Sequence, residues 1–181
     1  MMHKFDYWSP TEVMFGKGRE DETAAYVKKY GGSKVLLVYG GGSVERSGLL
    51  QRVKEQLDAA GIGYAEFGGV QPNPTVEYAR EGVKRAIESQ ADFILAVGGG
   101  SAIDTAKGIA HGAANPDVDI WKFWSGEEKV QKSMPVGVIL TISAAGSEGS
   151  DSCVITQENG SLKWGCPKTD VIRPKFSVLD P

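Results

Sequence analysis

The sequence VGGGSAIDTAK, residues 97–107, joins the end of an apolar run, a triple-glycine turn and the start of a helical segment. The apolar run, residues 93–97, is typical of a buried parallel strand. Glycine permits a sharp turn and lets a ligand approach the backbone. The first turn of a helix offers unpaired N–H groups and a partial positive charge. The stretch therefore predicts a phosphate-binding turn, with an ordinary tight turn as the alternative.

Two polar side chains of this stretch have different expected roles. Ser101 is expected to cap the helix N-terminus or to donate a further hydrogen bond to a phosphate. Asp104 would repel a phosphate, so we expect it to face the sugar or base of a ligand, or to interact with the helix dipole.

Outward from this stretch, buried apolar runs alternate with helical segments. The runs are residues 34–39, 64–67, 93–97, 135–140 and 176–180, and the helical segments are 20–30, 48–60, 76–89 and the residues after Gly100. This alternation predicts an α/β fold with a doubly wound, mostly parallel sheet and right-handed crossovers. Residues 5–16 predict two strands around Pro10 that cover a sheet edge, and residues 153–164 predict a β-hairpin that turns at 158–160.

A second glycine turn, residues 40–43, follows the apolar run 34–39. Neither turn satisfies G-x-G-x-x-G, because Glu45 and Ile103 stand where the last glycine would be, so an ordinary Rossmann fingerprint is not supported. Glu66 lies near the place of a ribose-binding acid, although a solvent-facing glutamate explains it as well.

The overall composition is that of a soluble globular protein. The 181 residues suffice for one domain, and the net charge of −3 argues against general affinity for nucleic acid. We expect no membrane partner and a cytoplasmic location, since no apolar run nears the roughly 20 residues of a membrane span and no signal core is present. Cys153 and Cys166 form no CxxC pair and are expected to be separate free thiols.

Residues 98–107 follow the pattern G-G-G-S-x-x-D-x-A-K, which resembles the signature of the iron-containing (group III) alcohol dehydrogenases. Further segments are similar to the butanol dehydrogenase and NADPH-dependent aldehyde reductase branch: YWSPTEVMFGKG at 7–18, PNPT at 72–75, TISAAGSE at 141–148 and FSVLDP at 176–181. The resemblance implies that residues 1–181 form a dinucleotide-binding domain that is Rossmann-like and similar to the N-terminal domain of dehydroquinate synthase. It also implies that the helical metal-binding domain of the family is absent from this chain.

The resemblance further implies site residues. The cofactor pyrophosphate is expected at Gly98, Gly99, Gly100 and Ser101, and the adenosine ribose at Gly40, Gly41, Gly42 and Ser43. Asp104 is expected near the nicotinamide and the substrate. The other expected contacts are Asn73, Thr141, Ser143, Val154 and Lys163, with Lys168 as the alternative to Lys163. Ala145 and Ser150 stand where the family usually has Thr and Asn.

The first glycine turn bears on the choice of cofactor. Branches of the family that prefer NADH tend to carry an aspartate here, whereas this turn has small residues and Ser43, which favours NADP(H) over NAD(H). Glu45 stands where the branch often has lysine, and Arg46 is the alternative source of positive charge.

No metal site of the chain's own is expected. The two histidines, His3 and His111, are far apart in sequence and form neither HxxxH nor HExxH, and no Ser/His/Asp set is present. His111 is interpreted as a partner of the helix dipole. In the family, one aspartate and three histidines of the second domain bind the metal, so Fe²⁺ or Zn²⁺ is expected only with that domain.

The implied chemistry is hydride transfer between a nicotinamide cofactor and a small alcohol or aldehyde. This chain alone is expected to bind the cofactor without catalysing the reaction. The alternatives are a polyol-phosphate dehydrogenase of the same superfold and a non-catalytic nucleotide-binding or dimerisation module. A homo-oligomer is expected, because residues 141–147 and the aromatic residues 121–124 would leave apolar surface uncovered.

Overall fold

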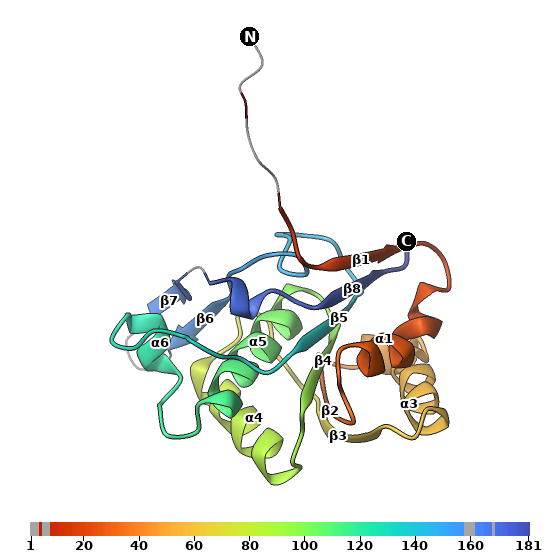
Figure 1. Ribbon diagram of the computed structural model, residues 1–181, viewed down its shortest axis with the longest axis horizontal. Coiled ribbons are helices and arrows are strands. Elements are labelled where there is room, and N and C mark those ends of the chain that lie inside the picture. Colours follow the sequence, from red (N-terminus) through yellow and green to blue (C-terminus); the bar gives the residue numbers. More distant parts are fainter. Residues whose placement is uncertain (1–3, 5–7, 158–161, 168) are drawn as a thin grey trace.

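The computed structural model describes residues 4, 8–157, 162–167 and 169–181. Its central sheet has six strands in the order β1-β8-β5-β4-β2-β3, all paired in parallel (Figure 1). The strands are β1 (Glu12–Phe15), β2 (Lys34–Tyr39), β3 (Gly63–Phe67), β4 (Phe93–Gly98), β5 (Val136–Leu140) and β8 (Phe176–Leu179). A separate antiparallel pair consists of β6 (Val154–Gln157) and β7 (Leu162–Gly165). The predicted parallel α/β sheet is confirmed, and β1 is an edge strand as expected.

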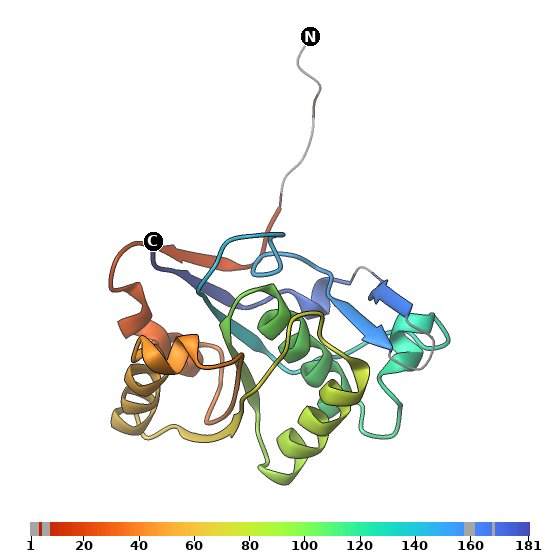
Figure 2. The same ribbon diagram turned by 180° about the vertical axis from the view of Figure 1, so that it is seen from behind.

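Helices cover both faces of the sheet (Figures 1 and 2). One face packs against α1 (Thr23–Lys29) and α3 (Leu49–Ala59), and the other against α4 (Val76–Glu88) and α5 (Gly100–Ala114). Alternate residues of β2 point to opposite faces, so Val35 and Leu37 contact the first pair of helices, and Leu36 and Val38 contact the second. Two short helices, α2 (Ser43–Arg46) and α6 (Trp121–Ser125), and two 3-10 turns (Arg19–Glu22 and Asp170–Ile172) complete the described elements.

Two details of the helices differ from expectation. The segment 20–30 begins as a 3-10 turn and becomes α-helical only at Thr23. On α4 the buried residues include Ala79, Gly82 and Ala86. Ile87, which the helical spacing of apolar residues predicts to be buried, is 47% exposed. Close packing against α5 explains the small buried residues, because a Cβ on Gly82 would lie 2.2 Å from Ile109.

The aromatic segment after α5 is packed rather than open. Phe123 and Trp124 on α6 are buried, and Trp121 stacks on Trp164 of β7 with ring centroids 5.5 Å apart. The expectation that residues 121–124 leave an uncovered apolar surface is therefore wrong, whereas Ile142 in the second expected patch is 66% exposed. Among the residues that the structure describes, no helix combines the length and apolar character needed to cross a bilayer.

The topology fixes where a ligand can bind. From β2 the chain adds β3 on one side, and then returns to place β4, β5 and β8 on the other side. The carboxyl ends of β2 and β4 therefore flank the point at which the winding reverses, where open α/β sheets bind ligands. Both glycine turns lie at this point.

Candidate functional site

A cleft of about 330 Å³ opens between the two glycine turns. It is lined by Gly40, Gly41, Ser43, Val44, Val70, Pro72, Gly98, Gly99, Gly100, Ser101, Ala102, Thr141 and Ile142. The structure thus brings together most residues expected to bind the pyrophosphate and the adenosine ribose, with Gly42 between two of them as the N-cap of α2. Thr141 is joined to the β4 turn, since its N–H donates to the carbonyl of Gly98 at 3.1 Å.

The structure explains why glycine occupies several positions of the cleft. Gly98 has a φ of +153°, and a Cβ there would lie 3.0 Å from Ala102. A Cβ on Gly99 would lie 2.7 Å from Ile142. Gly41 and Gly100 face open space, so any side chain there would enter the cleft. The cleft therefore presents backbone that a flat or phosphate-bearing ligand can approach closely.

The amino end of α5 points into this cleft. Gly99 is its N-cap, and the first helical hydrogen bond runs from the Ile103 N–H to the Gly99 carbonyl at 3.2 Å. The N-cap role expected for Ser101 is wrong, because the helix starts at Gly100 and Ser101 lies within its first turn. The amide groups before Ile103 are not used by the helix ladder and carry its partial positive charge.

Asp104 connects α5 to the long loop after β5. Its carboxylate accepts a hydrogen bond from the Ser147 hydroxyl at 2.5 Å and one from the Val154 N–H at 3.1 Å. Burial raises the pKa of Asp104, although the bonds from Ser147 and Val154 and the nearby Lys107 oppose that shift. Asp104 and Val154, two residues singled out from the sequence, are therefore direct partners.

Lys107, one helical turn further along α5, is fully buried beside this carboxylate. Its ammonium donates to the backbone carbonyls of Ser147, Ser150 and Ser152 at 2.7, 3.0 and 2.8 Å. Burial lowers the pKa of Lys107, and the neighbouring Cys153 and Asp104 oppose the shift. Lys107 thus fixes residues 147–152, the loop that presents a hydroxyl to Asp104.

The first glycine turn carries charge of both signs. Arg46 lies over Gly42, where a Cβ would be 2.7 Å from its guanidinium. Glu66 of β3 accepts a hydrogen bond from the Tyr39 hydroxyl at 2.8 Å and is paired with Lys54 at 2.7 Å. Burial and the bond to Glu66 raise the pKa of Tyr39 to about 12. The Glu66 carboxylate is therefore already neutralised by a protein cation.

The remaining expected residues lie outside the cleft lining. Asn73 adopts a left-handed φ of +58° and accepts a hydrogen bond from the Lys163 ammonium at 2.7 Å. Asn73 also lines a second hollow, together with Tyr78 and Thr156. Ser143 lies in a third, near Phe15 and Asp180. Lys168, the 158–160 turn, His3 and residues 5–7 lie outside the described residues.

Several contributors were missed from the sequence. Val70 and Pro72 line the cleft from the loop after β3, and Lys107 and Ser147 support Asp104. The loop after a strand next to the switch point was the available signal for the first two. Lys107 is the one lysine of α5, and no pattern in the sequence indicated that its side chain would be buried.

Among the described residues, no group of three or more His, Cys, Asp or Glu side chains is close enough to hold a metal ion. His111 is in the last turn of α5 as expected, yet its side chain is fully buried and lies 6.2 Å from the ring of Phe123 and 6.1 Å from that of Trp124.

Comparison with known proteins agrees with this geometry. The model of the family described as iron-containing alcohol dehydrogenase matches residues 10–181. The chain is 45% identical to the probable NADH-dependent butanol dehydrogenase 1 of Bacillus subtilis, covering 99% of this chain and 46% of the relative. It is 37% identical to the NADPH-dependent aldehyde reductase YqhD of Escherichia coli, with the same coverage of 99% and 46%.

A solved structure shows the same architecture. The NADH-dependent butanol dehydrogenase A of Thermotoga maritima superposes with a TM-score of 0.94 at 37% identity, covering 99% of this chain and 45% of that one. The chain therefore spans about half the length of the relatives that it matches. Since the family model matches nearly all of its residues, the chain belongs to the iron-containing alcohol dehydrogenase family, within the branch that includes the butanol dehydrogenases and YqhD.

Proposed function

We propose that residues 1–181 form the dinucleotide-binding domain of an NAD(P)H-dependent alcohol dehydrogenase or aldehyde reductase. The observation that carries the proposal is the cleft at the switch point, with a glycine turn on each side and the amino end of α5 directed into it. Bound there, the nicotinamide cofactor would supply the hydride chemistry. The chain's own residues bind and orient it.

Each part of the cleft has a proposed task. The amides of Gly100 and Ser101 hold the pyrophosphate, and the turn at Gly41 receives the adenosine ribose. Thr141 and Ile142 close the side of the cleft opposite that turn. Asp104 faces the nicotinamide end and is held in place by Ser147 and Val154. Asn73 and Lys163 form a polar pair at the rim, available to a ribose hydroxyl.

We further propose that NADP(H) is preferred over NAD(H). Arg46 lies at the first turn, where a 2′-phosphate would be received, and Glu66 is neutralised by Lys54. The relatives differ in this respect, since the Bacillus subtilis protein is named for NADH and YqhD for NADPH.

Hydride transfer to a small aldehyde is proposed for the whole protein and not for this stretch of it. The described residues contain no group of metal-ligating side chains, and polarising a carbonyl requires such a group or its equivalent. We expect the 181-residue chain to bind the dinucleotide and to leave butyraldehyde unreduced in the presence of NADPH and Fe²⁺ or Zn²⁺.

Isothermal titration of the 181-residue chain with NADPH and NADH tests the proposal. We expect saturable binding of both, tighter for NADPH, and its loss in Gly100→Val, whose side chain would project into the cleft. The matched control is Lys84→Met on the exposed face of α4. Unchanged binding by the Gly100→Val protein would place the dinucleotide elsewhere.

A further inference from the structure

Two cysteines that are separated along the chain lie opposite each other in the fold. Cys153 directly precedes β6 and Cys166 directly follows β7, so the antiparallel pair brings them together. The Cys166 N–H donates to the Cys153 carbonyl at 2.8 Å, and both side chains belong to one buried cluster. Both are free thiols. The expectation of free thiols is confirmed, but the register of the hairpin places the two cysteines opposite each other, which their spacing alone did not indicate.

The backbone geometry suits a covalent bond. Facing residues of a hydrogen-bonded antiparallel pair have Cα atoms about 5.5 Å apart, which lies within the range that a disulfide spans. The two side chains are on the same face of the pair, with only 2% and 3% of their surfaces exposed. No large backbone movement is needed for the sulfur atoms to meet.

The surroundings differentiate the two thiols. The adjacent Cys153 thiol, together with the neighbouring His111, lowers the pKa of Cys166 to about 6 against the effect of burial. Burial and the neighbouring Cys166 raise the pKa of Cys153. The pair thus consists of one thiol that ionises readily and one that stays protonated, as in an attacking and a resolving cysteine.

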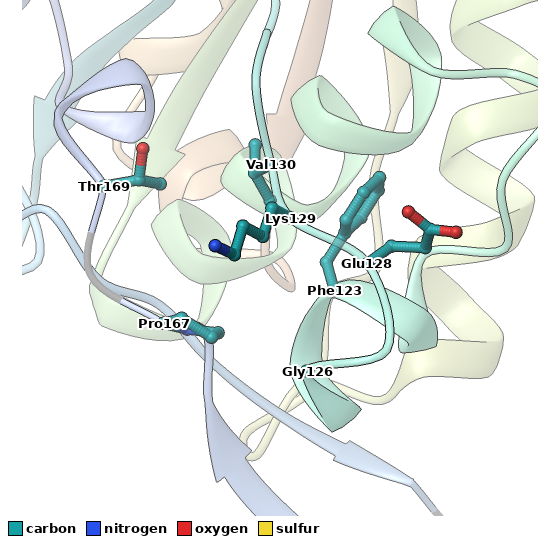
Figure 3. Close-up of a pocket in the computed structure, with 7 residues that line it drawn as sticks. All are labelled: Phe123, Gly126, Glu128, Lys129, Val130, Pro167 and Thr169. Carbon is teal, nitrogen blue, oxygen red and sulfur yellow. The ribbon is translucent and has the colours of Figure 1, made fainter.

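A cavity of about 350 Å³ is lined in part by Pro167, the residue after Cys166 (Figure 3). Pro167 forms one wall, and Phe123, which packs on His111, forms another. Lys129 extends between these walls toward Pro167 and Thr169 (Figure 3). A small oxidant that enters the cavity therefore reaches the residue that adjoins Cys166 in the chain.

We propose that Cys153 and Cys166 form a redox-sensitive modification site that a hydroperoxide converts reversibly to a disulfide. The Cys166 thiolate attacks one oxygen of hydrogen peroxide, the O–O bond breaks, and a sulfenic acid forms. The departing hydroxide takes up the proton that Cys166 lost on ionising and leaves as one water molecule. The Cys153 sulfur then displaces the hydroxyl group, which takes up the thiol proton and leaves as a second water molecule. The two cysteines lose two electrons in total, and these reduce hydrogen peroxide to water.

The site is coupled to the proposed dinucleotide cleft through the neighbours of Cys153. The Ser152 carbonyl accepts a hydrogen bond from Lys107 at 2.8 Å, and the Val154 N–H donates to Asp104 at 3.1 Å. Even a small shift of residue 153 toward residue 166, on formation of an S–S bond of about 2.05 Å, would lengthen these two hydrogen bonds. Oxidation is therefore expected to weaken dinucleotide binding about tenfold, the effect of losing one charge-assisted hydrogen bond. This second part rests on the proposed function.

The first experiment is independent of that function. The reduced 181-residue chain is treated with hydrogen peroxide, and its intact mass and its peptides are measured. We expect the loss of two hydrogen atoms, a peptide that links Cys153 to Cys166, and full reversal by dithiothreitol. In Cys153→Ser, the Cys166 sulfenic acid should persist and react with dimedone, and Cys166→Ser should give neither product. An unchanged mass, or links formed only between separate chains, would overturn the proposal.

The second experiment compares NADPH affinity in the reduced and oxidised wild-type chain. It therefore does not depend on whether a cysteine variant folds. A tenfold weaker affinity that dithiothreitol restores supports the coupling. A mapped disulfide with unchanged affinity overturns the coupling while the modification site stands. If the reduced chain binds no dinucleotide at all, the proposed function fails and the mass measurement still decides the chemistry.

Discussion

At the residue scale, the most consequential side chain is Lys107. A buried ammonium is tolerated only when its hydrogen bonds are satisfied, and here three backbone carbonyls of one loop accept them. Those carbonyls belong to a loop without regular secondary structure and depend on Lys107 in turn. Lys107 therefore supplies this loop with the hydrogen-bond donors that a neighbouring strand supplies within a sheet.

Replacing Lys107 by methionine should lower the free energy of unfolding by about 3 kcal/mol, because it leaves several buried acceptors unpaired. Urea unfolding followed by circular dichroism measures the change. Lys84→Met, a lysine on the exposed side of a helix, is the control and should change stability by less than about 0.5 kcal/mol. Equal stability of the two variants would contradict the role assigned to Lys107.

A second residue-scale prediction concerns Gly41, which faces open space in the cleft. In Gly41→Asp a carboxylate would lie near the proposed 2′-phosphate position, so the NADPH dissociation constant should rise roughly tenfold or more through charge repulsion. NADH affinity should change little. Gly41→Asn has the same shape without the charge, and titration of both variants with both cofactors separates charge from bulk. An equal loss for both cofactors in Gly41→Asp would argue against the 2′-phosphate assignment.

At the scale of elements, Asp92 ties the beginning of β4 to the beginning of β2. Its carboxylate accepts hydrogen bonds from the Ser33 N–H and the Lys34 N–H at 2.9 and 2.8 Å, and from the Ser33 hydroxyl. Burial raises the pKa of Asp92, but these hydrogen bonds outweigh burial and leave the pKa below the ordinary value of an aspartate. The two central strands are therefore joined at their amino ends by one carboxylate.

The pH dependence follows from the sign of this shift. Because the folded pKa is lowered, the unfolded chain binds more protons near pH 3.8, and the stabilisation is present above that pH and lost as the pH falls through the folded value. Asp92→Asn should cost about 1–2 kcal/mol at neutral pH and should flatten the acid limb of the stability curve. Urea unfolding between acid and neutral pH measures both effects. Asp58→Asn, an exposed site on α3, is the control, and an unchanged acid limb in Asp92→Asn would contradict the argument.

A helix or strand could be predicted from the sequence when the interactions that form it lie within its own residues. The run 34–39 contains its own signal, because Lys34 is followed by five consecutive apolar residues. A short apolar run of this kind is typical of a buried strand or a short buried helix segment, and β2 spans residues 34–39. The start of α5 was misjudged at Ser101, since the N-cap is Gly99, two residues before the expected serine cap. The short helix α6 escaped prediction because its aromatic residues are held by α5 and β7, contacts that local sequence does not encode.

The residues of the candidate site likewise divide into those that the sequence predicts and those that it does not. The glycine turns were predictable, because backbone exposure requires glycine in the sequence itself. The partnership of Asp104 with Val154 was not, since it depends on where the β6–β7 hairpin docks, and that of Cys153 with Cys166 depends on the register of the hairpin. The docking contact is backbone to backbone, with the Thr156 N–H donating to the Pro74 carbonyl at 2.8 Å. Such a contact leaves no mark on side-chain composition.

At the scale of the whole molecule, β1 ends the sheet and exposes apolar surface. Val13 and Phe15, on one face of the strand, are 58% and 69% exposed, whereas Met14 on the other face is buried. We propose that a second copy of the chain covers this edge. Sedimentation velocity should show a dimer, and Val13→Lys combined with Phe15→Lys should shift it to a monomer. Ile87→Lys, an equally apolar change on α4, is the control. A wild-type chain that stays monomeric at high concentration would contradict the proposal.

The position of β1 beside β8 also has a consequence for the way the chain is made (Figure 1). The strand near the start of the chain pairs in the sheet with the strand at its other end, so β1 has no partner until residues 176–179 have left the ribosome. At about 5–20 residues per second, that wait lasts on the order of ten seconds. During it, the helices of both faces and the strands from β2 to β5 can assemble from contacts closer in sequence, which form faster. Strand β1 is therefore placed only after β8 has been synthesised, and until then its unpaired edge is open to other nascent chains.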